Sequence, residues 1–225
     1  MKIVCISDLH GETPELPDGD LLIIAGDITA RDKIPEWKRF YDWLKTLQFK
    51  KIIYIAGNHD GFLEGCLNNT QAKEFYESTG FDPDCKPSDH IVYLCDSGTE
   101  FEGLKIWGSP WTPEFCDWHF MKKRAALKAV WDLVPDDTDI LVTHGPPLRV
   151  MDTVNPFCSA FERLGDYHLL QAMERVKPKL HVFGHIHGGY GQLVYKHQGP
   201  NTICVNAAHM DEQYKPVNKP IVVEL

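Results

Sequence analysis

Short apolar runs, each ended by a glycine or a polar residue, recur along the chain. Runs of this length are typical of strands that are buried on both faces in an α/β sheet. Ligands of such sheets gather at the carboxyl ends of the strands, so the residues that follow the runs are expected to converge on one edge. The runs that carry this argument cover residues 2–7, 20–25, 51–56, 139–142 and 179–183.

Apolar residues at helical spacing predict three helices. The first contains Trp37, Phe40, Tyr41, Leu44 and Leu47, the second Leu127, Val130, Trp131 and Val134, and the third Leu169, Leu170, Met173 and Val176 behind a candidate N-cap at Asp166. Shorter strands are expected at 90–95, 99–101, 104–107, 202–206 and 221–224. Alternating α/β units followed by hairpins predict an α/β fold with two facing mixed sheets flanked by helices.

A block of polar residues directly follows each of the first set of runs. The blocks are Asp8-Leu9-His10, Gly26-Asp27, Gly57-Asn58-His59-Asp60, Thr143-His144-Gly145-Pro146 and Gly184-His185-Ile186-His187. Any one of them alone can be a turn or a cap. Together, at five strand ends, they predict a metal site. Carboxylate and imidazole ligands suit Mn, Fe, Zn, Co or Ni and do not suit calcium.

A dinuclear site would place two cations about 3.5–4 Å apart, and an anionic ligand between them offsets their repulsion. Asp27 is the candidate for that bridge. We therefore expect two divalent ions, with Mn as the first expectation and Fe, Zn, Ni or Co as alternatives.

The order and spacing of these blocks resemble the calcineurin-like metallophosphoesterase superfamily, over nearly the whole chain from Ile3 to Val223. Three stretches are similar to a subgroup of small metallophosphoesterase-domain proteins, which are themselves similar in kind to class III cyclic-nucleotide phosphodiesterases. They are Trp107-Gly108-Ser109-Pro110-Trp111-Thr112-Pro113, Thr143-His144-Gly145-Pro146-Pro147, and Leu180-His181-Val182-Phe183-Gly184-His185-Ile186-His187 with Gly189-Tyr190-Gly191.

The resemblance implies a four-layer sandwich and a role for each polar block. It implies a first metal held by Asp8, His10, Asp27 and His187, and a second held by Asp27, Asn58, His144 and His185. His59 would be the catalytic residue that acts on the phosphate or on the leaving group.

Two loops without strong periodicity, 61–69 and 146–165, are expected to shape the substrate pocket. Near the predicted site, Trp111, Phe115 and Tyr190 are candidates for stacking on a nucleobase or a phenyl group. Arg149 is a candidate phosphate contact. The alternatives are that Trp111 packs beneath its own loop and that Arg149 forms a surface salt bridge.

Length and composition set the remaining limits. The 225 residues contain no Pro/Ser-rich linker and no internal repeat, which predicts a single domain over residues 1–225. The apolar run at the start is too short for a signal sequence or a membrane span, so no membrane partner is expected. Seven scattered cysteines without a CxxC pair predict free thiols in a reducing cytoplasm. A net charge of −9 disfavours duplex nucleic acid as a partner, whereas bound cations would still attract a small anionic ester.

The leading hypothesis is a phosphodiesterase for small phosphodiesters such as cyclic nucleotides. A hydroxide that bridges the two ions would attack phosphorus in line. His59, oriented by Asp60 or by a backbone group, would protonate the leaving oxygen. The alternatives are a nuclease or RNA-end-processing enzyme, a phosphomonoesterase, or a metal-binding scaffold without catalysis. The complete ligand set weighs against the scaffold, and the acidic charge weighs against the nuclease.

Overall fold

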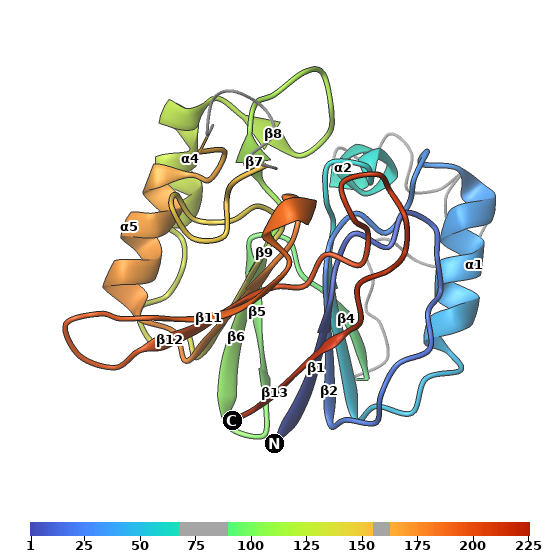
Figure 1. The fold of residues 1–225 in the computed structure, drawn as a ribbon, viewed down its shortest axis with the longest axis horizontal. Coiled ribbons are helices and arrows are strands. Elements are labelled where there is room, and N and C mark those ends of the chain that lie inside the picture. The colour runs from blue at the N-terminus through green and yellow to red at the C-terminus, as the bar shows by residue number, and fades with distance from the viewer. Residues whose placement is uncertain (68–89, 155–162) are drawn as a thin grey trace.

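The computed structural model describes residues 1–67, 90–154 and 163–225 and contains two mixed sheets that face each other (Figure 1). The first sheet has the order β13 (Ile221–Glu224), β1 (Lys2–Ile6), β2 (Leu21–Ala25), β3 (Lys51–Ile55) and β4 (Ile91–Tyr93). Its strands β1 to β4 run parallel, and β13 is antiparallel to β1.

The second sheet has the order β11 (Gly191–Tyr195), β12 (Thr202–Asn206), β10 (Leu180–Phe183), β9 (Ile140–Thr143), β6 (Leu104–Ser109) and β5 (Ser97–Phe101). Its four inner strands are parallel, and the edge strands β11 and β5 are antiparallel to their neighbours. Two short strands, β7 (Thr112–Pro113) and β8 (Met121–Lys122), pair with each other above the main sheets.

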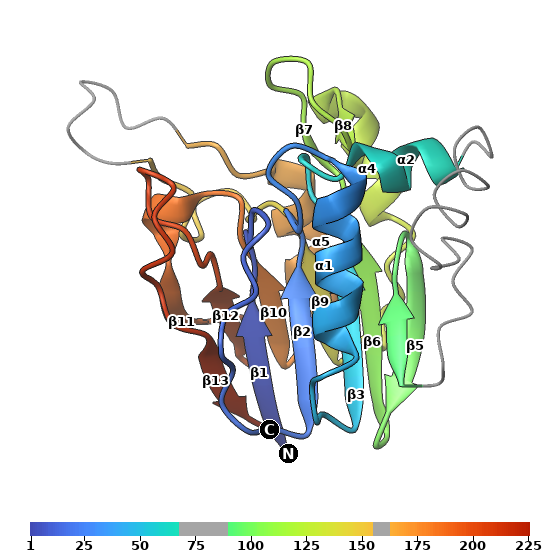
Figure 2. The ribbon, with the colours of Figure 1, turned by 90° about the vertical axis from the view of Figure 1, so that its right-hand side faces the viewer.

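Helices cover the outer face of each sheet. The helix α1 (Ile34–Leu44) lies against the first sheet, and α4 (Arg124–Trp131) and α5 (Tyr167–Val176) lie against the second (Figures 1 and 2). The layers are therefore helix, sheet, sheet, helix, and the predicted α/β sandwich is confirmed. None of the described helices is both long and apolar enough to cross a bilayer.

Each central strand contributes to two apolar layers, which explains why the strands read as continuous apolar runs. In β1, Val4 and Ile6 pack in the layer between the first sheet and α1, whereas Ile3 and Cys5 pack in the layer between the two sheets. All four are fully buried. Burial of a large aliphatic side chain stabilises the folded state by about 1.5–3 kcal/mol, so burial on both faces fixes the positions of these strands.

The structure differs from the sequence-based expectations at four short elements. The described part of the expected loop 61–69 is a helix, α2 (Gly61–Leu67), which is too short for helical periodicity to reveal it. The edge strand β11 was not predicted, because only alternate residues of it are partly buried. The pair β7 and β8 was also not predicted, because each strand has two residues. Of the second expected loop, residues 155–162 lie outside the described residues.

The predicted N-cap of α5 is present and has a second task. The Oδ1 atom of Asp166 accepts a hydrogen bond from the backbone N–H of Leu169 at 2.8 Å. The same atom accepts the indole N–H of Trp131, on α4, at 2.8 Å. Since Asp166 and Trp131 are buried, one carboxylate both starts α5 and joins it to α4.

We predict that Asp166→Ala lowers the free energy of unfolding by about 2–4 kcal/mol, because it removes the cap and leaves a buried indole N–H without an acceptor. Asp166→Asn is the matched control, since it keeps the oxygen, and it is expected to cost less than about 1 kcal/mol. Urea denaturation measures both. Equal, small losses in the two variants would contradict the assigned role.

Candidate metal centre

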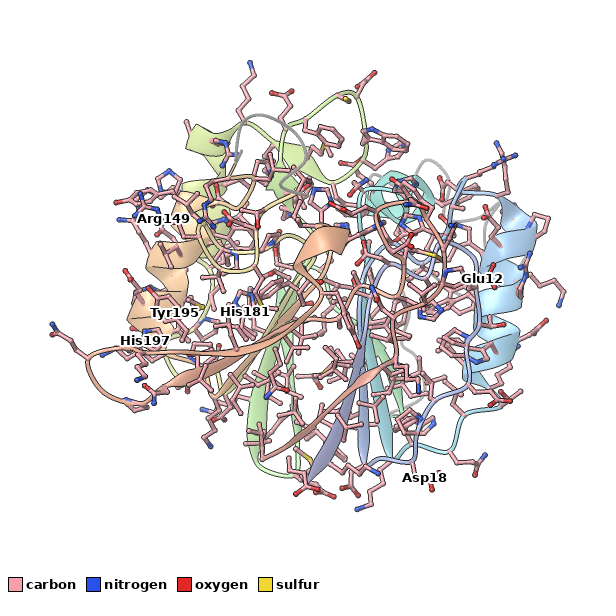
Figure 3. The ribbon with its side chains drawn as sticks, in the orientation of Figure 1. Glu12, Asp18, Arg149, His181, Tyr195 and His197 are labelled. Carbon is pink, nitrogen blue, oxygen red and sulfur yellow. The ribbon has the colours of Figure 1, made fainter. Side chains whose placement is uncertain are left out.

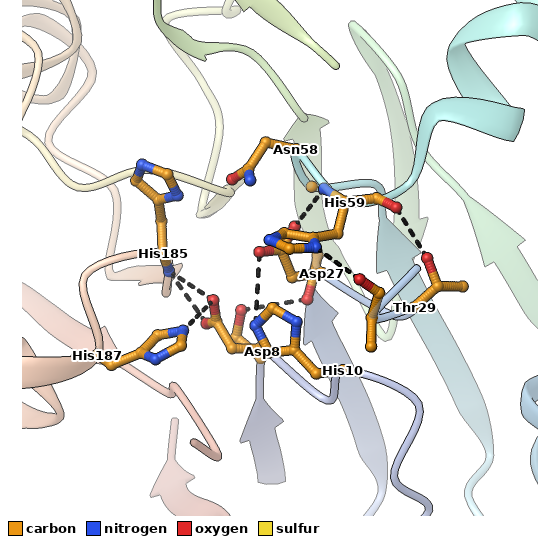
Figure 4. A network of polar contacts seen from close by, with 12 residues as sticks. Asp8, His10, Asp27, Thr29, Asn58, His59, His185 and His187 are labelled. Atoms are coloured by element: carbon orange, nitrogen blue, oxygen red, sulfur yellow. Dashed lines mark hydrogen bonds and ion pairs between the residues drawn. The ribbon is translucent and has the colours of Figure 1, made fainter. Parts of the chain in front are cut away.

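The seven predicted metal ligands lie together where β1, β2, β3, β9 and β10 end (Figure 4). Potential ligand atoms lie within 4.8 Å of one another in three groups: Asp8, His10 and His187; His10, Asp27 and His59; and Asp27, His144 and His185. Asn58 completes the cluster, because its Oδ1 lies 3.0 Å from His144 Nε2. Shared members join the groups into one site with two adjacent positions for a cation.

Sharp turns at the strand ends bring these side chains together. Asp8, His10, Asp27 and His185 have φ angles of 52°, 45°, 50° and 65°, in the left-handed region. This conformation is energetically unfavourable for non-glycine residues, and such backbone strain is concentrated at functional sites. Space is also limited, because a Cβ at Gly184 would lie 2.0 Å from Asp8 Oδ2.

The first cation position is defined by Asp8, His10 and His187. Both ring nitrogens of His10 are buried, and neither has a hydrogen-bond partner among the described residues. His187 Nδ1 lies 3.0 Å from the carbonyl oxygen of Asp211, which leaves Nε2 facing Asp8 Oδ1 at 3.3 Å. An unpaired buried polar group costs about 1–3 kcal/mol, and a cation held by these residues would remove that cost. The residues fit a divalent ion.

The second position lies around His144, which is fully buried. Its Nδ1 lies 2.9 Å from the carbonyl oxygen of Ala25, so Nε2 faces Asn58 Oδ1 at 3.0 Å and Asp27 Oδ1 at 3.3 Å. Burial disfavours the charged ring, but the carboxylates of Asp27 and Asp8 outweigh this effect and raise the pKa of His144 to about 9. A metal ion bound by His144 Nε2, Asn58 Oδ1 and Asp27 Oδ1 would take the place of the proton on Nε2.

Asp27 connects the two positions. Its Oδ2 lies 3.7 Å from His10 Nε2, and its Oδ1 faces His144. Burial favours the neutral acid, yet the neighbouring histidines, His144 above all, hold the pKa of Asp27 well below its usual range. A carboxylate that stays ionised and faces both positions is the arrangement that a bridging ligand needs.

Asp60 holds two ligand-bearing turns together. Its buried carboxylate accepts backbone N–H groups from Gly57 at 2.8 Å, Ile28 at 3.0 Å and Thr29 at 2.9 Å. Burial, followed by the charge of Asp27, raises the pKa of Asp60 to about 7. This residue therefore ties the turn after β2 to the turn after β3.

His59 is oriented by the backbone and not by Asp60. Its Nδ1 lies 3.0 Å from the carbonyl oxygen of Ala30. The main chain of His59 is fixed on both sides, since its N–H donates to Asp27 Oδ1 at 2.9 Å and its carbonyl accepts the Thr29 hydroxyl at 2.8 Å. Because Nδ1 is engaged, Nε2 is the ring nitrogen that is left for a substrate.

A cavity of about 260 Å³ opens over the ligand cluster. Its floor includes Asp27, Asn58, His185 and His187, and its wall includes His59. The rim carries three partly exposed aromatic side chains and one cation: Phe115, Trp118, Tyr214 and Arg124. Their rings and the aliphatic side chains between them make the outer cavity apolar, whereas its floor is polar.

Three residues that the sequence suggested for substrate binding do not belong to the described lining of this cavity. The indole N–H of Trp111 donates to Asp96 at 2.7 Å, and Lys122 Nζ lies 3.6 Å above its ring, so Trp111 packs beneath its loop. The Tyr190 hydroxyl donates to the carbonyl of Lys219. Arg149 is exposed on the outside of the molecule (Figure 3).

Phe115 was among the expected aromatics, but Trp118, Tyr214 and Arg124 were missed. Trp118 had a signal in the sequence, since it lies between Phe115 and Phe120 in an aromatic-rich segment without periodicity. Tyr214 had none, because it reaches the site from the segment before β13. Only the fold places its ring against His10 and His187, with both centroid distances at 5.1 Å.

An α/β sandwich that carries two adjacent ligand positions at its strand ends has the architecture of a dinuclear metallohydrolase. The family model of the calcineurin-like phosphoesterases matches residues 1–189, and the chain belongs to this family. Membership supports metal-dependent phosphoester hydrolysis by this protein.

Individual relatives agree with this assignment. The chain is 39% identical to metallophosphoesterase domain-containing protein 1 of Homo sapiens, over 100% of this chain and 71% of that protein. It is 33% identical to a UPF0046 protein of Caenorhabditis elegans, over 99% of this chain and 74% of that protein.

Solved structures share the fold at low sequence identity. A protein of Thermus thermophilus superposes with a TM-score of 0.59 at 14% identity, covering 99% of this chain and 98% of that chain. Phosphopantetheinyl hydrolase of Mycobacterium tuberculosis superposes with a TM-score of 0.55 at 15% identity, covering 98% of this chain and 95% of that chain.

We predict that Asp27→Asn reduces the bound metal from two ions to at most one per chain, because the amide has no charge to offset two adjacent cations. The substitution keeps the side-chain shape and an oxygen for the His59 N–H, and the melting temperature of the metal-free variant is measured alongside, because the buried contact between Asp27 and His144 loses its charge. Elemental analysis after equilibration with Mn measures the stoichiometry. Two tightly bound ions in the variant would rule out Asp27 as the bridge.

Proposed function

We propose that this protein is a phosphodiesterase that uses two divalent ions to hydrolyse small phosphodiesters, such as 2′,3′- or 3′,5′-cyclic nucleotides. The observation that carries the proposal is the cavity, which joins the ligand cluster and His59 to an apolar, aromatic rim. Its volume of about 260 Å³ lies just below the usual range of small-molecule pockets, which favours a small ester over a long polymer.

The rim favours a diester over a monoester. A diester carries one negative charge and keeps an organic group on each side of phosphorus, and the second group needs an apolar surface. Phe115 and Tyr214 provide exposed rings, at 54% and 60% exposure, for such a group. A monoester dianion carries more negative charge and would be bound better by a rim with several cationic side chains. The cationic side chain of the described rim is Arg124, and its guanidinium already donates to the carbonyls of Gly165 and Leu164.

Bound divalent ions would supply positive charge next to the phosphate and would lower the pKa of a coordinated water. The protein's own residues do the rest. Asp27 keeps the two positions adjacent, and Asn58 gives a neutral oxygen at the second. Ala30 holds His59 by Nδ1, so that Nε2 can deliver a proton to the departing oxygen.

The ligand chemistry supports Mn as the native ion, with Fe, Zn, Ni or Co as alternatives, because imidazole suits these metals better than it suits Mg. The partner that we propose is the small ester itself, without duplex nucleic acid or membrane. Cys5 and Cys204 are buried free thiols, and burial raises the pKa of Cys204 to about 12. Free thiols support a reducing compartment such as the cytoplasm.

We expect chelated protein to recover more activity with Mn than with Mg, and the Mn-loaded protein to cleave cyclic nucleotides and bis(nitrophenyl) phosphate faster than a nitrophenyl monoester or short RNA. The physical reason is the imidazole-rich ligand set together with the apolar rim. Steady-state rates across this panel, with metal content measured alongside, provide the test. A preference for the monoester or for RNA would replace the proposed substrate class, and equal rescue by Mg would contradict the ligand set.

We predict that His59→Ala keeps both ions but loses about 10²–10⁴-fold in rate on a cyclic nucleotide, the range typical of general acid catalysis. The loss should shrink on a nitrophenyl diester, because nitrophenolate leaves with little need of a proton. Rates on the two substrates and metal content are measured in parallel. An equal loss on both would indicate electrostatic stabilisation of the transition state, and loss of an ion would make His59 a ligand beside His10 and Asp27.

A further inference from the structure

We infer that Trp118 is a positioning residue that holds the His59 ring in line with the leaving group; the inference rests on the acid role proposed for His59. The two rings lie against each other in a tilted arrangement, with centroids 4.3 Å apart and an interplanar angle of 36°. Trp118 is nevertheless 43% exposed, so its place above His59 is not a consequence of burial in the core.

Within the described part of the chain, two other contacts orient the His59 ring. Its Nδ1 is fixed by the Ala30 carbonyl at one point, and the edge of the His10 ring approaches from another side, with centroids 4.6 Å apart and a tilt of 89°. One hydrogen bond fixes a direction but leaves rotation about it. The indole face restricts that rotation, and so it determines where Nε2 points.

The segment that carries Trp118 is tied to the segment that carries His59. Phe120 is fully buried, and its carbonyl accepts the Thr112 N–H at 2.9 Å. Next to Trp118, the His119 N–H donates to the carbonyl of Asn58 at 3.2 Å. These bonds hold the indole near the imidazole before any substrate arrives.

The His119 side chain adds a third connection, to α2. Its Nδ1 lies 3.2 Å from Glu64, and its ring covers Gly61, where a Cβ would lie 2.3 Å from His119 Nε2. Gly61 follows His59 and Asp60 directly in the chain. The loop between β7 and β8 is thus fastened to both ends of the turn that presents His59.

Trp118 differs in this respect from the two other aromatic residues of the rim. Phe115 is near the edge of His185, and Tyr214 approaches His10 and His187 edge-on. Neither ring stacks on His59. With one indole face covered by His59, Trp118 is less suited than Phe115 or Tyr214 to serve as a stacking surface for the organic group of the ester.

A double-mutant cycle tests the inference, with His59→Ala, Trp118→Ala and the combined variant assayed on a cyclic nucleotide and on a nitrophenyl diester. If Trp118 acts through His59, Trp118→Ala should lower kcat about 10–10²-fold on the cyclic nucleotide, the size of effect expected from a misplaced catalytic group. The loss should be much smaller on the nitrophenyl diester, and Trp118→Ala should cost nothing further once His59 is Ala. Trp118→Phe should recover most of the rate because it restores a ring face.

A spectroscopic measurement keeps the test independent of turnover. In metal-free protein, the imidazole NMR signals of His59, assigned with His59→Ala, should show Nδ1 as the protonated nitrogen, and Trp118→Ala should broaden or lose this signal. Tyr167→Ala is the matched control, since Tyr167 is an aromatic residue on α5 with 52% exposure that is not among the described residues lining the cavity. It should leave both the rate and the His59 signal unchanged.

Other outcomes would overturn the inference. An equal rise in KM on both substrates that persists in the His59→Ala background would make Trp118 a substrate contact. An unchanged His59 signal with a loss of rate that is independent of the leaving group would do the same. If the rate loss of His59→Ala alone did not depend on the leaving group, the acid role proposed for His59 would be wrong. This outcome is distinguished from a failure of the Trp118 inference because it is measured in the single variant. Melting temperatures of Trp118→Ala and Trp118→Phe separate a folding defect from a catalytic one.

Discussion

The site is organised around three buried carboxylates, those of Asp8, Asp27 and Asp60, and the charge of Asp27 acts on the ionisation of the other two. A buried charge is costly unless hydrogen bonds or opposite charges compensate it. Backbone N–H groups compensate Asp60, and the backbone N–H of His185 helps Asp8. Asp27 depends on the surrounding imidazoles, above all on His144, whose pKa is raised to about 9 in the metal-free protein.

The layered fold provides the rigidity that such a concentration of charge requires. The strands that carry the ligands are buried on both faces, so their ends cannot shift to relieve repulsion among the carboxylates. The adaptation occurs in the turns. Asp8, Asp27 and His185 take up left-handed backbone conformations, and Gly184 leaves room for the Asp8 carboxylate. Packing energy in the sheets thus offsets local strain at the strand ends.

The part of the site that could be predicted from the sequence is the part that depends on local chain geometry. A buried strand followed by a polar block places its side chains at a known edge of a sheet, so the approach of Asp8, Asp27 and His144 to one another follows from the topology. The residues that shape the cavity depend on long-range packing instead. Trp118 reaches His59 through the anchoring of Phe120, and Tyr214 reaches His10 from a distant segment, so no local pattern in the chain indicates either contact.

The absence of Trp111, Tyr190 and Arg149 from the described lining of the cavity has the same reason. Each is close in sequence to a block that forms the site, but closeness in sequence does not determine the direction of a side chain in a loop. Trp111 turns toward Asp96 and Lys122 because an indole can satisfy its N–H there while covering apolar surface. Asp60 was suggested by the sequence as a partner for the His59 side chain. In the structure its carboxylate accepts hydrogen bonds from backbone N–H groups of two turns instead.

His59 stands at the boundary between these two parts of the site. Its main chain is fixed by Asp27 and Thr29, which belong to the rigid turns, while its ring meets Trp118, which belongs to the rim. The ligand turns can determine where the phosphate is held, and the rim can determine which ester groups are accepted. The leaving-group acid that we propose for His59 has to be aligned with both parts. A side chain whose main chain is fixed by one part and whose ring contacts the other satisfies that requirement.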